Sequence, residues 1–173
     1  MSIANKKDLK EQEIRTLYIS PALKNKGWET GQNMREEYYF TDGRVVIAGS
    51  QHSTAEGKKA DYLLYHNGKP IAVVEAKDNK HSVGAGIQQA IDYALILDLQ
   101  FAYSSNGDAF LEHDFSTGKE RELKLDEFPT EEELYNRYLT LKNYTPEEQK
   151  IVETVVREVV TVRDEVRRHE VQV

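Results

Sequence analysis

Residues 60–77 read ADYLLYHNGKPIAVVEAK, and this stretch decides the fold. Two apolar runs, at 60–65 and 70–77, flank the dipeptide Asn67-Gly68. An Asn-Gly pair between two such runs is the strongest short signal for a β-hairpin, because both residues tolerate the left-handed backbone that tight turns require. The stretch therefore predicts two antiparallel strands of a β-sheet.

Charged side chains interrupt the second apolar run. Glu75 and Lys77 stand two residues apart, a spacing that puts both side chains on one face of a strand. Charges within an apolar strand are costly unless they are paired or bind a metal. A three-residue connection at 67–69 would place Asp61 directly opposite Glu75, about 4.5 to 5.5 Å away at Cβ, whereas a two-residue turn would send Asp61 to the other face. We expect the first geometry, in which the two carboxylates converge.

Helical and strand patterns alternate along the rest of the chain. Apolar periodicity predicts a first helix at 7–26 with a break at Pro21, and a second helix at 82–99 that is entered through the glycines of 84–86. The other expected elements are strands at 38–40, 45–48, 101–104 and 109–112, a polar loop at 49–59, and helices that open at 130 and 146. This order predicts an α/β domain with a central mixed sheet of about five strands flanked by helices.

Composition limits the classes of protein that fit. The chain has 173 residues, of which 39% are hydrophobic and 31% charged, as expected for one globular domain. It has no cysteine, which excludes disulfides and thiolate metal sites and fits a reducing, cytoplasmic setting. Its longest apolar run is far shorter than the roughly 20 residues of a membrane span. The net charge of -7 argues against a protein that binds nucleic acid by bulk electrostatics, unless a metal ion neutralises acidic residues of a site or another part of a larger assembly delivers the nucleic acid.

The expected site has the ligands that a hard divalent cation prefers. The carboxylates of Asp61 and Glu75, the backbone carbonyl of Ala76 and several waters would form an oxygen environment suited to Mg²⁺ or Mn²⁺. A cation held there would lower the pKa of a bound water and neutralise charge on a scissile phosphate. Lys77, beside that water, would orient or deprotonate it and hold a phosphate oxygen. These residues predict phosphodiester hydrolysis.

The same residues resemble a known signature. Asp61, followed after the hairpin by Glu75-Ala76-Lys77, resembles the D…(E)XK motif of the PD-(D/E)XK nucleases, with Ala60 in the place of the usual proline. Gln89 and Tyr93 match a QxxxY pattern whose spacing puts both on one helix face. In similar nucleases this pair lies near DNA and the lysine, so the resemblance implies a supporting or DNA-binding role for Gln89 and Tyr93.

A wider resemblance covers most of residues 9–140. The stretches at 11–15, 19–23 and 27–28, with 128–130 and 133–134, resemble the N-terminal domain of the type I restriction enzyme R subunit. This resemblance implies a restriction-endonuclease-like core at 1–140 and a metal site that a first-helix glutamate joins. That glutamate is Glu11 or Glu13, of which we favour Glu11.

The resemblance also implies partners and a setting. The expected function is that of a type I site-specific deoxyribonuclease domain acting on double-stranded DNA with methyltransferase and specificity subunits. No Walker A sequence occurs in the chain, so ATP would act only through a motor domain beyond the helical extension at 141–173.

Two other functions stay open: a stand-alone repair or junction nuclease of the same superfamily, and a catalytically silent assembly or DNA-binding module. Lys58, Lys59 and Lys80 are expected to contact the DNA backbone, ahead of His52 and His81.

Overall fold

The computed structural model describes residues 5–41, residues 57–141 and eight single helical positions between 147 and 161. The expected strand at 45–48 and most of the helical segment after 146 lie outside the described residues. The expected loop at 49–59 is described only at its end, where Lys58 and Lys59 already belong to a strand.

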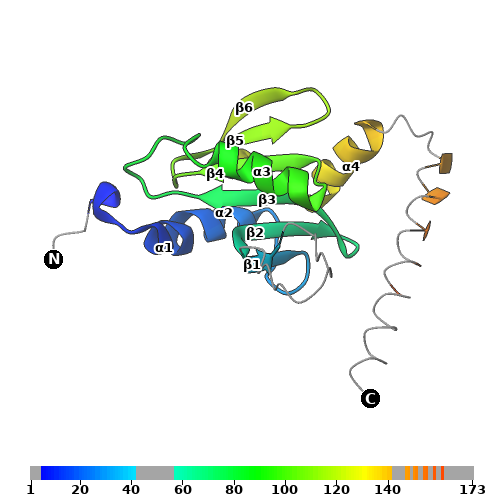
Figure 1. Cartoon of the computed structure of the whole chain (residues 1–173), viewed down its shortest axis with the longest axis horizontal. Coiled ribbons are helices and arrows are strands. Elements are labelled where there is room, and N and C mark those ends of the chain that lie inside the picture. Colours follow the sequence, from blue (N-terminus) through cyan, green and yellow to red (C-terminus); the bar gives the residue numbers. More distant parts are fainter. Residues whose placement is uncertain are drawn as a thin grey trace, which may run out of the picture.

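A six-stranded mixed sheet forms the centre of the molecule, with strands in the order β1-β2-β3-β4-β5-β6 (Figure 1). Among the strands that the structure describes, only β3 and β4 pair in parallel, and the helix α3, Ile87–Leu97, connects them. The strands are β1 Met34–Phe40, β2 Lys58–His66, β3 Lys69–Ala76, β4 Phe101–Ser105, β5 Ala109–Asp114 and β6 Lys119–Lys124. The expected mixed sheet flanked by helices is thus confirmed, with one strand more than foreseen. The unforeseen strand is β6, in which only Leu123 is buried, and its sequence therefore shows no alternation of apolar and polar residues that could predict a strand.

The first helical segment does not stop at Pro21. It runs from α1, Glu11–Ile14, through a π-helical stretch, Arg15–Ile19, into α2, Ser20–Asn25. Pro21 lies in the first turn of α2, directly after the π-helical stretch, and because it has no N–H it cannot donate to the helical ladder at this point. The predicted break is therefore a change of helix type rather than an interruption.

The later helices also differ from expectation mainly at their ends. α3 spans Ile87–Leu97, so it begins after Gly86 rather than at residue 82. α4 spans Glu131–Leu141, opens where expected and begins with a capping box, in which Thr130 N donates a hydrogen bond of 2.9 Å to Glu133 Oε2. No helix among the described residues is long and apolar enough to cross a membrane.

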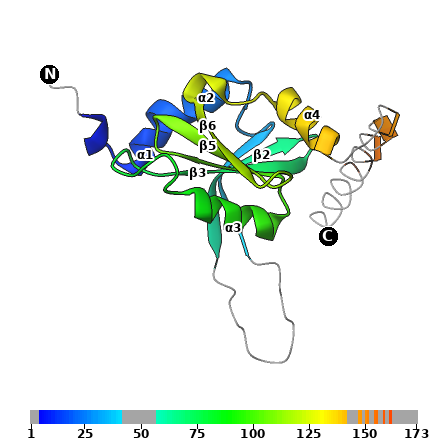
Figure 2. The same cartoon turned by 90° about the horizontal axis from the view of Figure 1, so that it is seen from above.

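Helices cover both faces of the sheet (Figure 2). One face carries α1, α2 and α4, and the other carries α3. The core between the sheet and α1, α2 and α4 contains large fully buried side chains such as Trp28, Tyr103 and Phe128. Trp28 Nε1 donates a hydrogen bond of 2.9 Å to the carbonyl of Pro129, which ties the end of α2 to the start of α4. The second core lies under α3 and includes Val73, Ala90 and Ala102.

The β2–β3 hairpin reaches the expected register by an unexpected route. Its turn has two residues, Asn67-Gly68, because His66 pairs with Lys69. The prediction of a three-residue connection is therefore wrong. A bulge then shifts the register between Tyr65 and Leu64, which leaves Ile71 as the extra residue of β3. From there Tyr62 pairs with Val74, and Asp61 comes level with Glu75 despite the short turn.

At Glu37 the alternation of side chains along β1 is interrupted, so that residues of the same parity before and after it face opposite sides of the sheet. In β1, Met34 packs in the core under α1 and α2, whereas Tyr38 and Phe40 pack against the core under α3. In β2, Tyr62 likewise packs in the core under α1 and α2, whereas Ala60 packs in the core under α3. Glu37 has a positive φ of 51°, a backbone conformation that residues other than glycine rarely adopt. The pairs on either side, Glu36 with Tyr62 and Tyr38 with Ala60, place Glu37 level with Asp61.

Candidate active site

Asp61 and Glu75 lie side by side in the sheet, and both are buried. The backbone amide of Asp61 donates a hydrogen bond of 3.1 Å to Glu75 Oε1. The amide of Ala76 donates one of 2.8 Å to Asp61 Oδ2. Each carboxylate is therefore anchored to the backbone of the neighbouring strand, and the hairpin and its bulge together fix the pair.

The electrostatics of this pair are unfavourable when both groups carry charge. Burial, and after it the negative charge of Asp61, raises the pKa of Glu75 well above its ordinary value. Lys77 acts in the opposite direction but does not outweigh burial. The pair thus tends to retain a proton, unless another positive charge takes the proton's place.

Lys77 is positioned by α3. Its Nζ donates to Gln89 Oε1 at 3.3 Å, and Gln89 Nε2 donates to Tyr93 Oη at 2.8 Å. Gly86, just before α3, lies against the same cluster: a Cβ there would come within 3.0 Å of Ser104 Oγ, a tight contact, and within ordinary contact distance of Glu75 Cβ and Lys77 Cε. The structure therefore brings together the lysine and the QxxxY pair.

The two glutamates of the first helix have different surroundings. Burial, and after it the charge of Asp61, raises the pKa of Glu11, while Lys77 and Arg15 act to lower it. Glu11 is thus within electrostatic reach of the site. Glu13 instead caps its own helix, since Lys10 N donates a hydrogen bond of 2.8 Å to Glu13 Oε2. This geometry favours Glu11, although its role in metal binding stays a prediction.

Arg15 is a site residue that the sequence reasoning missed. Its side chain is only 7% exposed, and its Nη1 lies 3.6 Å from Asp61 Oδ1. Its Nη2 donates to the Asp61 carbonyl at 3.4 Å, and its guanidinium lies over the Tyr62 ring at 5.0 Å. The signal was present in the sequence, because Glu11 and Arg15 are four apart and share a helix face.

Protein side chains could supply only part of the ligands that a divalent cation needs at this site. The described residues contain no group of three or more acidic or histidine side chains arranged to hold a metal. Two buried carboxylates that resist simultaneous ionisation nevertheless fit a cation whose other ligands are a backbone carbonyl and water, as Mg²⁺ commonly has. Asp61, Glu75 and the carbonyl of Ala76 are the residues that would hold it.

The other predicted contact residues lie around this site or apart from it. Lys59 contacts Glu37 at 3.4 Å on the outer part of β2. His81 contacts Asp78 Oδ1 at 2.9 Å, and that contact is the first cause of a lowered pKa of Asp78. His52 lies outside the described residues. None of these contacts shows a role toward DNA, so those roles stay predictions.

A further buried carboxylate, that of Glu112, lies between β5 and α4. Glu112 Oε1 and Oε2 accept hydrogen bonds from Arg137 at 2.8 and 2.9 Å. Arg121 Nε donates at 2.9 Å and Tyr103 Oη at 2.6 Å. Burial alone would raise the pKa of Glu112, but these donors outweigh it and lower the pKa to about 2. With every lone pair occupied, Glu112 ties α4 to the sheet.

The known proteins that this chain resembles are R subunits of type I restriction enzymes. A family model described as "Type I restriction enzyme R protein N terminus" matches residues 44–121, a range that contains Asp61, Glu75, Lys77, Gln89 and Tyr93 but not Glu11. The resemblance to the R proteins of type I restriction enzymes is therefore confirmed.

Two relatives show which part of an R protein the chain resembles. The Type I restriction enzyme EcoAI endonuclease subunit of Escherichia coli is 39% identical over 150 residues, which are 84% of this chain and 18% of that protein. A fragment of a chain assigned as an HsdR subunit of a type I restriction enzyme from Vibrio vulnificus YJ016 is 46% identical, with a TM-score of 0.68. This match covers 80% of the present chain and 27% of the other. The chain thus resembles the N-terminal part of an R subunit and spans under a fifth of the curated relative's length.

Proposed function

We propose that this chain is a Mg²⁺-dependent DNA endonuclease domain of the PD-(D/E)XK type that hydrolyses phosphodiester bonds within a type I restriction enzyme R subunit. The observation that carries the proposal is the buried Asp61–Glu75 pair with Lys77 held beside it by Gln89. A buried acidic pair and a lysine on adjoining strands have no packing role that apolar residues would not fill better.

Each residue has a distinct task in this proposal. Asp61, Glu75 and the Ala76 carbonyl hold Mg²⁺ or Mn²⁺, which supplies Lewis-acid activation of water and charge neutralisation when bound. Lys77 donates to a phosphate oxygen and orients the attacking water. Gln89 and Tyr93 fix the Lys77 ammonium, because each donates or accepts within one continuous chain of hydrogen bonds.

Glu11 and the chain beyond the core belong to the same proposal. Glu11 adds negative charge near Asp61 and Lys77 from the start of α1. Residues 1–140 form the nuclease core, and 141–173 form the extension toward an ATP-driven motor. Double-stranded DNA, the methyltransferase and the specificity subunits are the partners, in the cytoplasm. Because those subunits would supply recognition, the domain alone should cut weakly and without sequence preference.

Nicking of supercoiled plasmid tests the proposal directly. Wild type and the variants Asp61→Asn and Glu13→Gln are incubated with plasmid and either Mg²⁺ or Mn²⁺. We expect metal-dependent nicking by wild type and Glu13→Gln and none by Asp61→Asn, because Glu13 Oε2 accepts the hydrogen bond of the Lys10 amide at the start of its own helix. Equal nicking by all three proteins would contradict the proposal.

Two outcomes would favour the other functions. Strong, autonomous cleavage of branched DNA would favour a stand-alone junction nuclease. Folded wild type that neither nicks DNA nor binds Mn²⁺ would favour a catalytically silent module.

A further inference from the structure

Arg15 is held loosely for a buried arginine. Its contacts with Asp61 and Glu37 measure 3.4 to 3.6 Å, longer than the roughly 2.7 to 2.9 Å of well-made charge-assisted hydrogen bonds. Its Nε, alone among the buried side-chain nitrogen and oxygen atoms of the described residues, has no hydrogen-bond partner. Apart from its contact with Tyr62, the guanidinium has one unpaired N–H and three long contacts, so the two carboxylates hold it less tightly than well-made hydrogen bonds would.

The guanidinium lies between two carboxylates. Nη1 is 3.4 Å from Glu37 Oε1 and 3.6 Å from Asp61 Oδ1. These two acids come level with each other on β1 and β2, at the point where Glu37 takes its positive φ. Strain of this kind costs on the order of 1 to 3 kcal/mol and persists where the surrounding structure imposes it.

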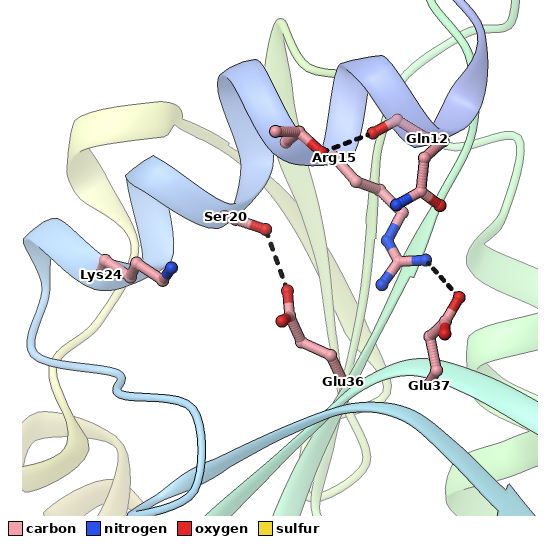
Figure 3. Close-up of a pocket in the computed structure, with 7 residues that line it drawn as sticks. Gln12, Arg15, Ser20, Lys24, Glu36 and Glu37 are labelled. Carbon is pink, nitrogen blue, oxygen red and sulfur yellow. Dashed lines mark hydrogen bonds and ion pairs between the residues drawn. The ribbon is translucent and has the colours of Figure 1, made fainter.

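Arg15 also has room to move. A polar cavity of about 290 Å³ lies between the first helix and β1. Figure 3 shows Arg15 reaching from the helix toward Glu37 on the strand beneath, with Ser20 and Lys24 farther along the helix. Glu36 accepts a hydrogen bond from Ser20 Oγ at 3.1 Å and takes no part in the Arg15 contacts that the structure shows.

One oxygen of Asp61 is the point of competition. Oδ2 is engaged by the Ala76 amide at 2.8 Å, whereas Oδ1 has the Arg15 contact of 3.6 Å. Oδ1 is thus the Asp61 oxygen that is more open to a metal, and a guanidinium that closed on it would occupy its lone pairs and add a repelling charge.

We propose that Glu37 is a positioning residue that shares Arg15 with Asp61 and so keeps Asp61 Oδ1 open to a divalent cation. This inference rests on the proposed metal-dependent function. Glu37 offers the guanidinium a second carboxylate on the cavity side, where the Lys59 ammonium lies 3.4 Å from the same Oε1. Without that charge, Arg15 closes on Asp61.

Calorimetric titration with Mn²⁺ tests the inference on the whole chain, with thermal melting to show that each variant is folded. Glu37→Gln keeps the side-chain shape and the strained backbone but removes the charge. We expect it to weaken Mn²⁺ binding about 5-fold, somewhat less than the roughly 10- to 100-fold typical when a direct partner of a metal ligand is lost. Glu36→Gln, the neighbour on the same strand, is the matched control and should bind as wild type does.

A double-mutant cycle shows whether Glu37 acts through Arg15. In an Arg15→Met background, Glu37→Gln should change the affinity by less than about 2-fold, because the competing charge is gone. Glu37→Asp in the wild-type background should restore part of the lost affinity.

The possible failures are distinct. If wild type binds Mn²⁺ and Glu37→Gln binds equally well, or if its effect persists in the Arg15→Met background, the inference is wrong and the metal site stands. If folded wild type binds no Mn²⁺ at all, the proposed function falls and the inference falls with it.

Discussion

Replacement of Glu75 by Gln should change how the stability of the metal-free domain depends on pH. Glu75 is 2% exposed, and burial beside Asp61 raises its pKa above the ordinary value of 4.5. An acid with a raised pKa binds more protons in the folded state than in the unfolded chain. The free energy of unfolding therefore falls as the pH rises from 4.5 toward the folded pKa.

The size of this effect has an upper limit. Asp61 and Glu75 share one excess proton, so the slope cannot exceed about 1.4 kcal/mol per pH unit. Between pH 6 and pH 8 the wild type should lose at most about 3 kcal/mol through this pair. Glu75→Gln cannot ionise, keeps an oxygen acceptor for the Asp61 amide, and should lack that part of the decline.

Urea unfolding at several pH values between 6 and 8, in the presence of a chelator, measures the difference. Glu112 does not interfere, because its pKa is lowered to about 2 and the stability it contributes is lost only in acid. We expect the free energy of unfolding of Glu75→Gln to exceed that of wild type by a margin that widens with pH. Saturating Mn²⁺ should abolish the wild-type decline. Parallel pH profiles for the two proteins would refute the reasoning.

Two further substitutions separate stability from chemistry. Arg137→Met should lower the free energy of unfolding by about 3 kcal/mol in urea, because it leaves the buried Glu112 with fewer donors, while Mn²⁺ affinity is retained. Weakened metal binding would show instead that this cluster supports the site. Gln89→Leu should reduce the nicking rate about 10-fold with Mn²⁺ affinity unchanged, because it removes the acceptor of Lys77 and the link from that acceptor to Tyr93. An unchanged rate would remove Gln89 from the account.

The sequence predicted the acidic pair for a reason that was only half correct. The apolar strands, the Asn67-Gly68 turn and the convergence of Asp61 with Glu75 were all foreseen. The turn, however, is one residue shorter than assumed, and a bulge at Ile71 restores the register. A bulge depends on how a strand packs against both of its neighbours, so the pattern within one hairpin does not reveal it.

Other misses have similar physical causes. β6 pairs at the edge of the sheet with mostly exposed side chains, so hydrogen bonding along the backbone forms it without an apolar pattern. Arg15 and Glu37 meet because the first helix packs over β1 at the point where Glu37 takes its positive φ, and a local sequence pattern does not reveal such a packing. Local spacing did place Gln89 and Tyr93 on one face, since a helix of ordinary geometry fixes that relation.

The most direct test of the account is calorimetric titration of the purified chain with Mn²⁺ beside Glu75→Ala, because metal binding requires no motor domain. We predict saturable binding by wild type that is lost in Glu75→Ala, with both proteins folded by circular dichroism. Folded wild type that binds no Mn²⁺, even with DNA present, would contradict the central claim that Asp61 and Glu75 form a metal site.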